Sequence, residues 1–351
     1  MKAAVIVAPH EVEIREVERP SPVPGEALVQ IEAVGVCGSD LHAYEGTQPF
    51  FRYPQIGGHE VVGTVVELVP HEEPPAPIPG RGQPHPPAVG ERVVLDPSMP
   101  CGGCYPCRTG RYNCCEQMRV LGVHAPGAFA EYMVAPLECL HGVSAGISAD
   151  AAVMIEPLSI GVESTTRARV TEDDSVLIIG AGTIGLLAMQ VLRMAGAREV
   201  IVSDVSEARL AVARQMGALH TVNPSAQDFA GAVRDLTDAQ GFDLTFEAVG
   251  ISATVAQSVA AVRDGGTVVW IGNSQKIVEV DMQAIVTREL QVIGSYGMNE
   301  RDFSRALAML SDGRIDVAPL ITRRAALAEG PGLFDELLRD EAVIKCVIEI
   351  P

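Results

Sequence analysis

Five of the chain's eight cysteines lie close together between residues 101 and 115, and four of them have a regular spacing. Cys101, Cys104 and Cys107 are each separated by two residues, and Cys115 follows Cys107 after seven more. Four thiolates at this spacing, with glycines and a proline supplying the turns, match a closed tetrahedral structural zinc site. Cys114 adjoins Cys115, but the side chains of adjacent residues usually point apart. The pattern therefore predicts one structural zinc ion in a lobe at about residues 97–117.

A second set of potential ligands is spread widely along the sequence. Cys37, His59, Glu60 and Glu156 combine soft and hard donors, which is typical of an open catalytic zinc. With Cys37, neutral His59 and one carboxylate, the ligand charges balance Zn²⁺, and the ion stays a Lewis acid that lowers the pKa of a substrate hydroxyl. Single cysteines and histidines are more often structural, so spacing alone does not establish this site. Either Glu60 or Glu156 supplies the inner carboxylate.

A catalytic alcohol site also needs a path for the proton that leaves the hydroxyl. Ser39 and His42 offer a hydroxyl-to-imidazole relay to solvent, and Glu156 is a further catalytic candidate. Hydride would leave the same carbon for a nicotinamide, so the protein supplies position and electrostatics while the cofactor supplies the redox chemistry.

A glycine-rich turn follows the apolar run at residues 176–179. Gly180, Gly182 and Gly185 have the G-x-G-x-x-G spacing, and a helix is predicted over residues 183–195. Asp204 ends the next apolar run, where a carboxylate binds the adenine ribose and favours NAD over NADP. Because strand, glycines, helix, strand and acid occur in order, a chance triplet or a membrane helix over residues 175–192 is disfavoured. The residues expected to bind the cofactor are Gly180, Gly182, Thr183, Ile184, Gly185, Asp204, Arg209, Val249 and Gly272.

The elements that must position these groups fall into two kinds. Residues 1–66 read as short strands separated by proline and glycine turns, whereas residues 174–292 alternate strands and helices. We expect an α/β protein with a β-rich catalytic domain at residues 1–152 and a doubly wound parallel sheet at residues 153–292. Residues 293–351 are predicted to return to the catalytic domain. Residues 70–88 are too rich in proline for a helix or paired strand, and His71 and His85 there are expected to be solvated.

Composition narrows the classes of partner. The chain has 351 residues and a net charge of −19, which disfavours nucleic acid and anionic membrane surfaces. A strand-like run begins at Lys2 without a signal-peptide cleavage region, so a cytoplasmic location is expected. Clustered cysteines in such a chain indicate metal binding more than disulfides.

Four motifs in order resemble the zinc-containing medium-chain dehydrogenase/reductase family. They are GVCGSDLH at residues 35–42, GHEVVG at 58–63, CGGCYPCRTGRYNCC at 101–115 and GAGTIG at 180–185. The resemblance implies a GroES-like catalytic domain, a Rossmann domain, NAD, and two zinc ions per subunit: catalytic zinc at Cys37, His59 and a carboxylate, and structural zinc at the four cysteines that end with Cys115. It also implies a homodimer or homotetramer.

Glu156 and the residues after it resemble the polyol branch of this family, which includes sorbitol dehydrogenase. Residues 48–54, 110–116 and 120–124 look most like bacterial enzymes that oxidise L-galactonate or L-gulonate at C5, and a sugar carboxylate would then need Arg52, Arg119 or His124. The alternatives are L-threonine 3-dehydrogenase, sorbitol or another polyol dehydrogenase, and a non-enzymatic NAD-binding protein. Three features depart from the family pattern: the proline-rich insertion at residues 70–88, Gly57 and Glu163.

Overall fold

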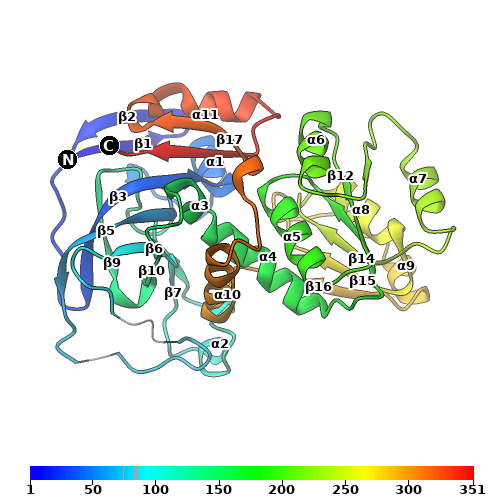
Figure 1. Ribbon diagram of the computed structural model, residues 1–351, viewed down its shortest axis with the longest axis horizontal. Coiled ribbons are helices and arrows are strands. Elements are labelled where there is room, and N and C mark those ends of the chain that lie inside the picture. Colours follow the sequence, from blue (N-terminus) through cyan, green and yellow to red (C-terminus); the bar gives the residue numbers. More distant parts are fainter. Residues whose placement is uncertain (74, 83–85) are drawn as a thin grey trace. The chain divides into compact units, whose positions relative to one another are not determined.

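The computed structural model describes residues 1–73, 75–82 and 86–351 (Figure 1). Contacts divide the chain into two compact units. Unit 1 contains Met1–Glu156 and Asn299–Pro351, and unit 2 contains Pro157–Met298. The expected α/β fold class, with a β-rich domain and a parallel-sheet domain, is confirmed.

Unit 1 is built on a large sheet. Among the described residues this sheet has seven strands in the order β10-β6-β5-β3-β18-β17, with β9 also pairing with β3. Its central strand β3 spans eleven residues with few exposed positions, so apolar side chains on both faces enter the core. Its strands are β3 (Glu26–Val36), β5 (Glu60–Val69), β6 (Arg92–Leu95), β9 (Tyr132–Pro136), β10 (Leu140–Gly142), β17 (Ile321–Ala326) and β18 (Lys345–Glu349).

Smaller elements complete unit 1. A second sheet joins β1 (Lys2–Ala8), β2 (Glu11–Glu16) and β4 (Gln55–Ile56), and β7 (Ser98–Met99) pairs with β8 (Arg119–Val120). The helices are α1 (Gly38–Glu45), α2 (Tyr105–Arg108), α3 (Ala149–Val153), α10 (Glu300–Ser311) and α11 (Gly330–Arg339).

The end of the chain is part of the central sheet of unit 1. Strand β18 pairs antiparallel with β3, and Cys346 lies opposite Val36. In Figure 1 the red β18 lies beside the blue β3. The last residues are therefore next to the strand that leads to Cys37.

Unit 2, all of whose residues are described, contains a six-stranded parallel sheet. The order is β13-β12-β11-β14-β15-β16, so the chain starts in the middle and winds outward in both directions. The strands are β11 (Ser175–Ile179), β12 (Glu199–Ser203), β13 (His220–Val222), β14 (Phe242–Glu247), β15 (Val262–Trp270) and β16 (Gln291–Gly294). The helices are α5 (Thr183–Met194), α6 (Glu207–Gln215), α7 (Phe229–Leu236), α8 (Ser252–Ala261) and α9 (Met282–Thr287), and α4 (Ile155–Ala168) leads into the unit.

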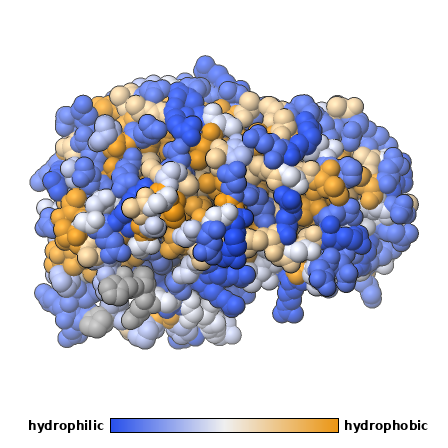
Figure 2. Space-filling model, viewed as in Figure 1, coloured by the Kyte–Doolittle hydropathy of each residue, from blue (hydrophilic) through white to orange (hydrophobic). Residues whose placement is uncertain are grey.

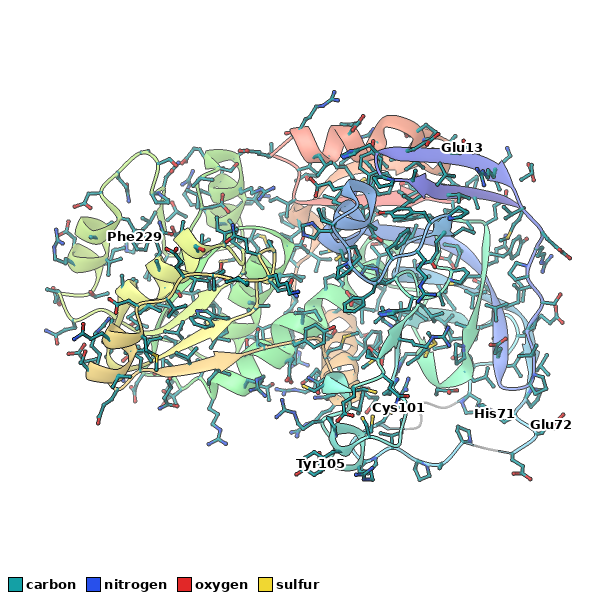
Figure 3. The ribbon with its side chains drawn as sticks, turned by 180° about the vertical axis from the view of Figure 1, so that it is seen from behind. Glu13, His71, Glu72, Cys101, Tyr105 and Phe229 are labelled. Atoms are coloured by element: carbon teal, nitrogen blue, oxygen red, sulfur yellow. The ribbon has the colours of Figure 1, made fainter. Side chains whose placement is uncertain are left out.

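The proline-rich insertion contains no helix or strand in its described part, as predicted. His71 is not simply solvated, because its Nε2 lies 3.4 Å from Glu138 Oε2. His85 lies outside the described residues. Figure 3 shows His71 and Glu72 at the start of this insertion, and Cys101 and Tyr105 on the cysteine lobe.

Residues 78–82 of the insertion form what we call the docking loop. Ile78 packs against the buried residues of the cysteine lobe, and Gly82 N donates to Glu300 Oε2 at 3.2 Å. Arg81 Nη2 donates to Ser98 O at 3.1 Å and to Glu138 O at 3.3 Å. The insertion therefore ties the cysteine lobe to the rest of unit 1.

Hydrophilic residues occupy much of the face in Figure 2, with hydrophobic residues interspersed. None of the helices in the described ranges has the length and apolar character needed to cross a membrane.

Candidate metal centres and cofactor loop

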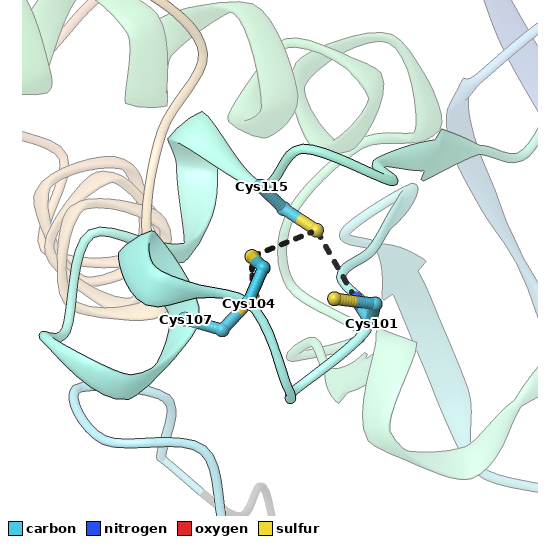
Figure 4. A group of neighbouring side chains, drawn as sticks. All are labelled: Cys101, Cys104, Cys107 and Cys115. Carbon is cyan, nitrogen blue, oxygen red and sulfur yellow. Dashed lines mark hydrogen bonds between the residues drawn. The ribbon is translucent and has the colours of Figure 1, made fainter.

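The four predicted cysteines of the lobe come together. The sulfur atoms of Cys101, Cys104, Cys107 and Cys115 all lie within 4.8 Å of one another (Figure 4). Cys114 is exposed and is not part of the group. A set of four converging sulfurs is the donor set that zinc prefers in closed structural sites, so the residues fit that ion.

Backbone amides prepare this group for a metal. The N–H groups of Cys101 and Gln117 donate to the Cys115 sulfur at 3.2 and 3.3 Å. Hydrogen bonds from the backbone of Cys107 and Glu116 lower the pKa of Cys104 to about 6. Donors aimed at sulfur favour the thiolate, which is the form that binds metal. At Cys115 burial outweighs these donors and leaves the pKa raised, so Cys104 is the thiol most ready to bind.

A second group joins Cys37, His59 and Glu60, whose ligand atoms also lie within 4.8 Å of one another. Cys37 precedes α1, and His59 and Glu60 stand where β5 begins. His59 and Glu60 are 5% and 1% exposed, so both are withdrawn from solvent. One sulfur, one imidazole and one carboxylate form the mixed donor set of an open zinc site, and the residues therefore fit a catalytic zinc ion.

Asp40 holds the two segments of this mixed group together. Its Oδ2 accepts from Cys37 N at 2.9 Å, and its Oδ1 accepts from Gly58 N at 3.1 Å. The same Oδ1 lies 3.8 Å from His59 Nδ1. A carboxylate behind a ligating histidine orients the ring, so Asp40 is a positioning residue.

The unusual Gly57 has a steric explanation at this point. A Cβ added there would lie 3.1 Å from Phe129 and 3.3 Å from Asp40 Oδ1. A larger residue would press on the carboxylate that joins the Cys37 and His59 segments. Glycine at this position leaves Asp40 undisturbed.

Lys345 reaches the mixed group from the C-terminal strand. Its Nζ donates to Glu60 Oε1 at 2.6 Å, to Glu60 Oε2 at 2.7 Å and to Val36 O at 3.1 Å. Burial lowers the pKa of Lys345, but the attraction of Glu60 and Cys37 outweighs it and leaves that pKa raised. Lys345 is therefore a cation that offsets one carboxylate of the site.

Of the two carboxylates left open by the sequence, the geometry places only Glu60 in the three-residue group. Glu156 lies outside it, yet close enough for its charge to act on His59 and Lys345. Burial raises the pKa of Glu156 to about 7. Gly35 makes room for Glu60, because a Cβ there would lie 2.0 Å from Glu60 Oε2.

The two predicted relay residues lie on α1. Ser39 Oγ is buried and has no hydrogen-bond partner within the described parts of the chain. His42 is 42% exposed, and its Nδ1 lies 3.3 Å from Thr47 Oγ1 and 3.4 Å from Glu45 Oε2. No direct Ser39–His42 hydrogen bond is found among described residues, so a further hydroxyl or water must connect them.

The predicted glycine loop leads from β11 into α5. A Cβ on Gly185 would lie 1.9 Å from Gly180 O, so helix and strand can pack this closely only through glycine. A Cβ on Gly182 would meet nothing within 4 Å, which leaves the first turn of the helix open for a phosphate. Thr183 and Ile184 form that first turn.

Asp204 follows β12 beside the glycine loop. Its Oδ2 accepts from Ala181 N at 2.7 Å, and its Oδ1 accepts from Ser206 N at 2.8 Å. Each oxygen keeps acceptor capacity for a ribose hydroxyl, and the residues fit a dinucleotide. Arg209 lies on α6, five residues after Asp204 along the chain.

Val249 and Gly272 follow the next two strands at the same edge of the sheet. Val249 Cγ2 would lie 2.7 Å from a Cβ on Gly180, so it flanks the glycine loop. Glu247 Oε1 accepts from Val249 N at 2.9 Å and from Gly250 N at 2.7 Å, which fixes this loop. Glu163, the other residue that departs from the family pattern, is buried on α4.

Asp40, Lys345 and Glu247 were not predicted as site residues from the sequence. Asp40 could have been found, since it lies inside the GVCGSDLH motif three residues after Cys37. Lys345 carries no local signal, because it meets Glu60 only through the pairing of β18 with β3.

Comparison with known protein families gives two matches. The family model described as "Alcohol dehydrogenase GroES-like domain" matches residues 23–145, and "Zinc-binding dehydrogenase" matches residues 183–312. The first range contains both metal-capable groups, and the second begins inside the glycine loop.

Relatives of known name cover almost the whole chain. L-galactonate-5-dehydrogenase from Escherichia coli K12 is 32% identical over 99% of this chain and 98% of its own length. L-threonine 3-dehydrogenase from Pyrococcus furiosus is 36% identical over 89% of this chain and 87% of its own length. A solved structure from Sinorhizobium meliloti 1021, assigned to the zinc-binding dehydrogenases and bound to NADP, has a TM-score of 0.89 at 32% identity, with 99% of this chain and 98% of that one covered.

Proposed function

This chain belongs to the zinc-type alcohol dehydrogenases with a GroES-like domain, and on that basis we propose that it oxidises a secondary hydroxyl of a sugar acid or polyol. Its hydride acceptor is NAD, and its product is the corresponding ketone. The family resemblance of the four sequence motifs is confirmed by these matches, as is the expectation of a zinc-dependent dehydrogenase.

The observation that carries this proposal is the mixed group of Cys37, His59 and Glu60. Its three different donors converge in a buried position. A purely structural zinc ion would instead be coordinated by four thiolates, as in the cysteine lobe. A zinc ion bound there supplies Lewis acidity toward an alcohol oxygen. A non-enzymatic NAD-binding protein has no use for such a group.

The protein's own residues bind the metal and transfer the proton. Cys37, His59 and Glu60 would hold the metal, and Asp40 keeps the segments that carry Cys37 and His59 in place. Ser39 Oγ, buried without a partner among described residues, is the acceptor for the proton of the substrate hydroxyl. His42 on the same helix is open to solvent and delivers that proton outward.

Lys345 offsets the negative charge of Glu60, to which it donates two hydrogen bonds. Burial raises the pKa of both Glu156 and Asp40, which favours their neutral forms near His59. Both effects limit the negative charge around the mixed group, so a divalent ion bound there would stay electrophilic.

The relatives suggest two candidate substrates. An acyclic sugar acid of the L-galactonate or L-gulonate type, oxidised at C5, is the first candidate because a relative of that activity matches the chain from end to end. L-Threonine is the second, because a threonine dehydrogenase has the higher identity of the two relatives, 36% against 32%.

A substrate panel tests the proposal. Purified protein supplied with zinc and NAD is offered L-galactonate, L-gulonate, sorbitol and L-threonine, and NADH is followed by its absorbance. We expect the highest kcat/KM with a sugar acid. Turnover of L-threonine alone would reject the sugar-acid substrate, and absence of zinc-dependent turnover with any alcohol would reject the enzyme class.

Asp204 provides the test of cofactor choice. Its carboxylate is set to accept from ribose hydroxyls and to repel a 2′-phosphate, although one solved relative binds NADP. Asp204→Ala should lower the ratio of kcat/KM for NAD to that for NADP by about tenfold, the size of one charge-assisted hydrogen bond. The matched control is Asp228→Ala, an exposed acid at the start of α7. An unchanged ratio in Asp204→Ala would show that this carboxylate does not bind the ribose.

We also propose that the protein forms a homodimer or homotetramer through unit 2. Strand β16 is the edge of the six-stranded sheet, and apolar side chains near it are exposed, among them Met282 at 68%, Val286 at 60% and Val292 at 38%. Pairing of two such edges would cover these residues. Light scattering measures the mass directly. The cytoplasmic location stays a prediction.

A further inference from the structure

The two loops that flank the mixed metal group meet in an aromatic contact. The segment between α1 and β4 carries Phe50, and the turn after β8 carries His124. Their ring centroids are 5.2 Å apart and the planes are inclined by 26°, which is a stacked arrangement. Phe50 is 57% exposed, so this ring pair presents an apolar face to solvent.

The turn that carries His124 rests directly on the segment before His59. A Cβ on Gly122 would lie 3.2 Å from His59 Cβ, and Ala128 N donates to Gly58 O at 3.0 Å. Gln55 Nε2 donates to Val123 O at 2.8 Å, which joins the Phe50 side to the same turn. The Phe50–His124 pair is therefore held in a fixed position next to the mixed metal group.

His124 has a defined tautomer. Its Nδ1 accepts from Val120 N at 3.1 Å, so in the neutral ring the proton must be on Nε2. Burial lowers the pKa of His124, and the nearby charge of Arg119 lowers it further. The neutral imidazole thus offers one N–H donor, and its ring is hydrogen-bonded to Val120, the neighbour of Arg119 in β8.

Arg119 is the cation of this group. It is exposed on β8, and within residues 1–73, 75–82 and 86–351 its side chain forms no ion pair or hydrogen bond. Its guanidinium is therefore available to a ligand, unlike that of Arg323, which binds Glu329 and Glu336. A guanidinium with a neutral N–H donor beside it suits a carboxylate.

We propose that Arg119 and His124 bind the terminal carboxylate of the substrate, while the exposed Phe50 ring packs against the carbon chain next to it. This rests on the sugar-acid function proposed above and names the residues that select an acid over a neutral polyol. Arg52, the other arginine considered from the sequence, does not contribute to the lowered pKa of His124 and is assigned no role in this group.

The test compares a sugar acid with its own alditol, which lacks the carboxylate. Arg119→Gln should raise KM for L-galactonate roughly tenfold to a hundredfold, the value of a hydrogen bond to a charged group, with kcat little changed. KM for the corresponding alditol should stay within twofold of wild type. Arg119→Lys should recover part of the loss, because it restores the charge without the planar fork.

The variant His124→Phe distinguishes the contribution of the Nε2–H donor from that of the stacked ring. It keeps the stacked surface on Phe50 and removes Nε2–H, so it should raise KM for L-galactonate alone, by less than Arg119→Gln. Arg111→Gln, which changes another exposed arginine of unit 1, is the matched control and should leave both substrates unaffected.

The outcomes distinguish the two proposals. A KM increase confined to the acid supports the carboxylate site. An equal effect on both substrates, or none on either, overturns the assignment of Arg119 while the sugar-acid function stands. Wild-type protein that oxidises alditols but no sugar acid overturns the sugar-acid function itself, and the carboxylate site with it.

Discussion

The two metal-capable groups of unit 1 are built in opposite ways. The cysteine lobe takes all its ligands from residues 101–115, and its sulfurs are supported by nearby backbone amides. The mixed group takes its members from residues 37, 59 and 60, and relies on Asp40 and Lys345 for support. The first group depends on local turns, and the second depends on the packing of distant strands.

This difference in construction corresponds to a difference in chemistry. Four thiolates fill the coordination of a zinc ion and leave no place for a substrate. Three mixed ligands leave one position open, and the buried charges around them need partners of their own. We therefore expect loss of a ligand to affect catalysis in the mixed group and stability in the lobe.

The largest expected effect comes from the ligands of the mixed group. Cys37→Ser or His59→Ala should lower kcat/KM about a thousandfold or more, because several kcal/mol of Lewis-acid stabilisation are lost. NAD affinity, measured by fluorescence titration, should be retained, and zinc content should fall from two to one per chain. Retained turnover in either variant would contradict the catalytic assignment.

Removal of a lobe ligand should give the reverse pattern. The variant Cys107→Ser replaces a buried ligand of the lobe. Because the closed zinc site is then lost, Tm should fall by about 10 °C. The kcat of protein that remains folded at low temperature should stay close to wild type. If Cys107→Ser abolished turnover and left Tm unchanged, the lobe would not be the structural site that we contrast with the catalytic mixed group. Cys114→Ser, at the exposed neighbouring thiol, is the matched control.

The Glu60–Lys345 pair tests the long-range support of the mixed group. Lys345→Met leaves Glu60 as an unpaired charge at 1% exposure, which should cost about 3–5 kcal/mol of unfolding free energy. The measurement is the urea midpoint of the metal-free protein. Lys345→Arg keeps the charge and should lose less. Equal stability of Lys345→Met and wild type would show that this pair does not hold the C-terminal strand in place.

The smallest effect is expected at the docking loop. Arg81→Leu removes the donor to Ser98 O and Glu138 O, and should cost about 1–3 kcal/mol. Since the loop touches the lobe, zinc should be extracted from the four cysteines faster by a chelator. Arg111→Leu, at an exposed site of the same lobe, serves as control. If both variants release zinc at the wild-type rate, the insertion does not stabilise the lobe.

Much of this architecture was accessible from the sequence, for reasons that vary by region. Strands β11 and β12 and the helix between them were predicted closely, because buried parallel strands are continuous apolar runs, as at β11, which ends just before Gly180. The cysteine lobe was predicted because its ligands are neighbours along the chain. Strand β17 and helix α11 were not predicted, since residues 321–326 include two arginines and α11 contains a kink at Pro331.

The mixed group could be predicted in its ligands but not in its supports. Residue types and motifs pointed to Cys37 and His59, whereas the choice between Glu60 and Glu156 needed distances. Lys345 could not have been found, because a lone lysine near the end of a chain looks like a solvated surface charge until β18 is placed beside β3. The role of Gly57 likewise required the position of Phe129.

The order of these residues along the chain has a consequence for biosynthesis. Glu60 is synthesised long before Lys345, so its ammonium partner is missing until β18 has emerged from the ribosome. The cysteine lobe, complete once residue 115 has emerged, can capture its zinc much earlier. Maturation of the two centres is therefore ordered in time.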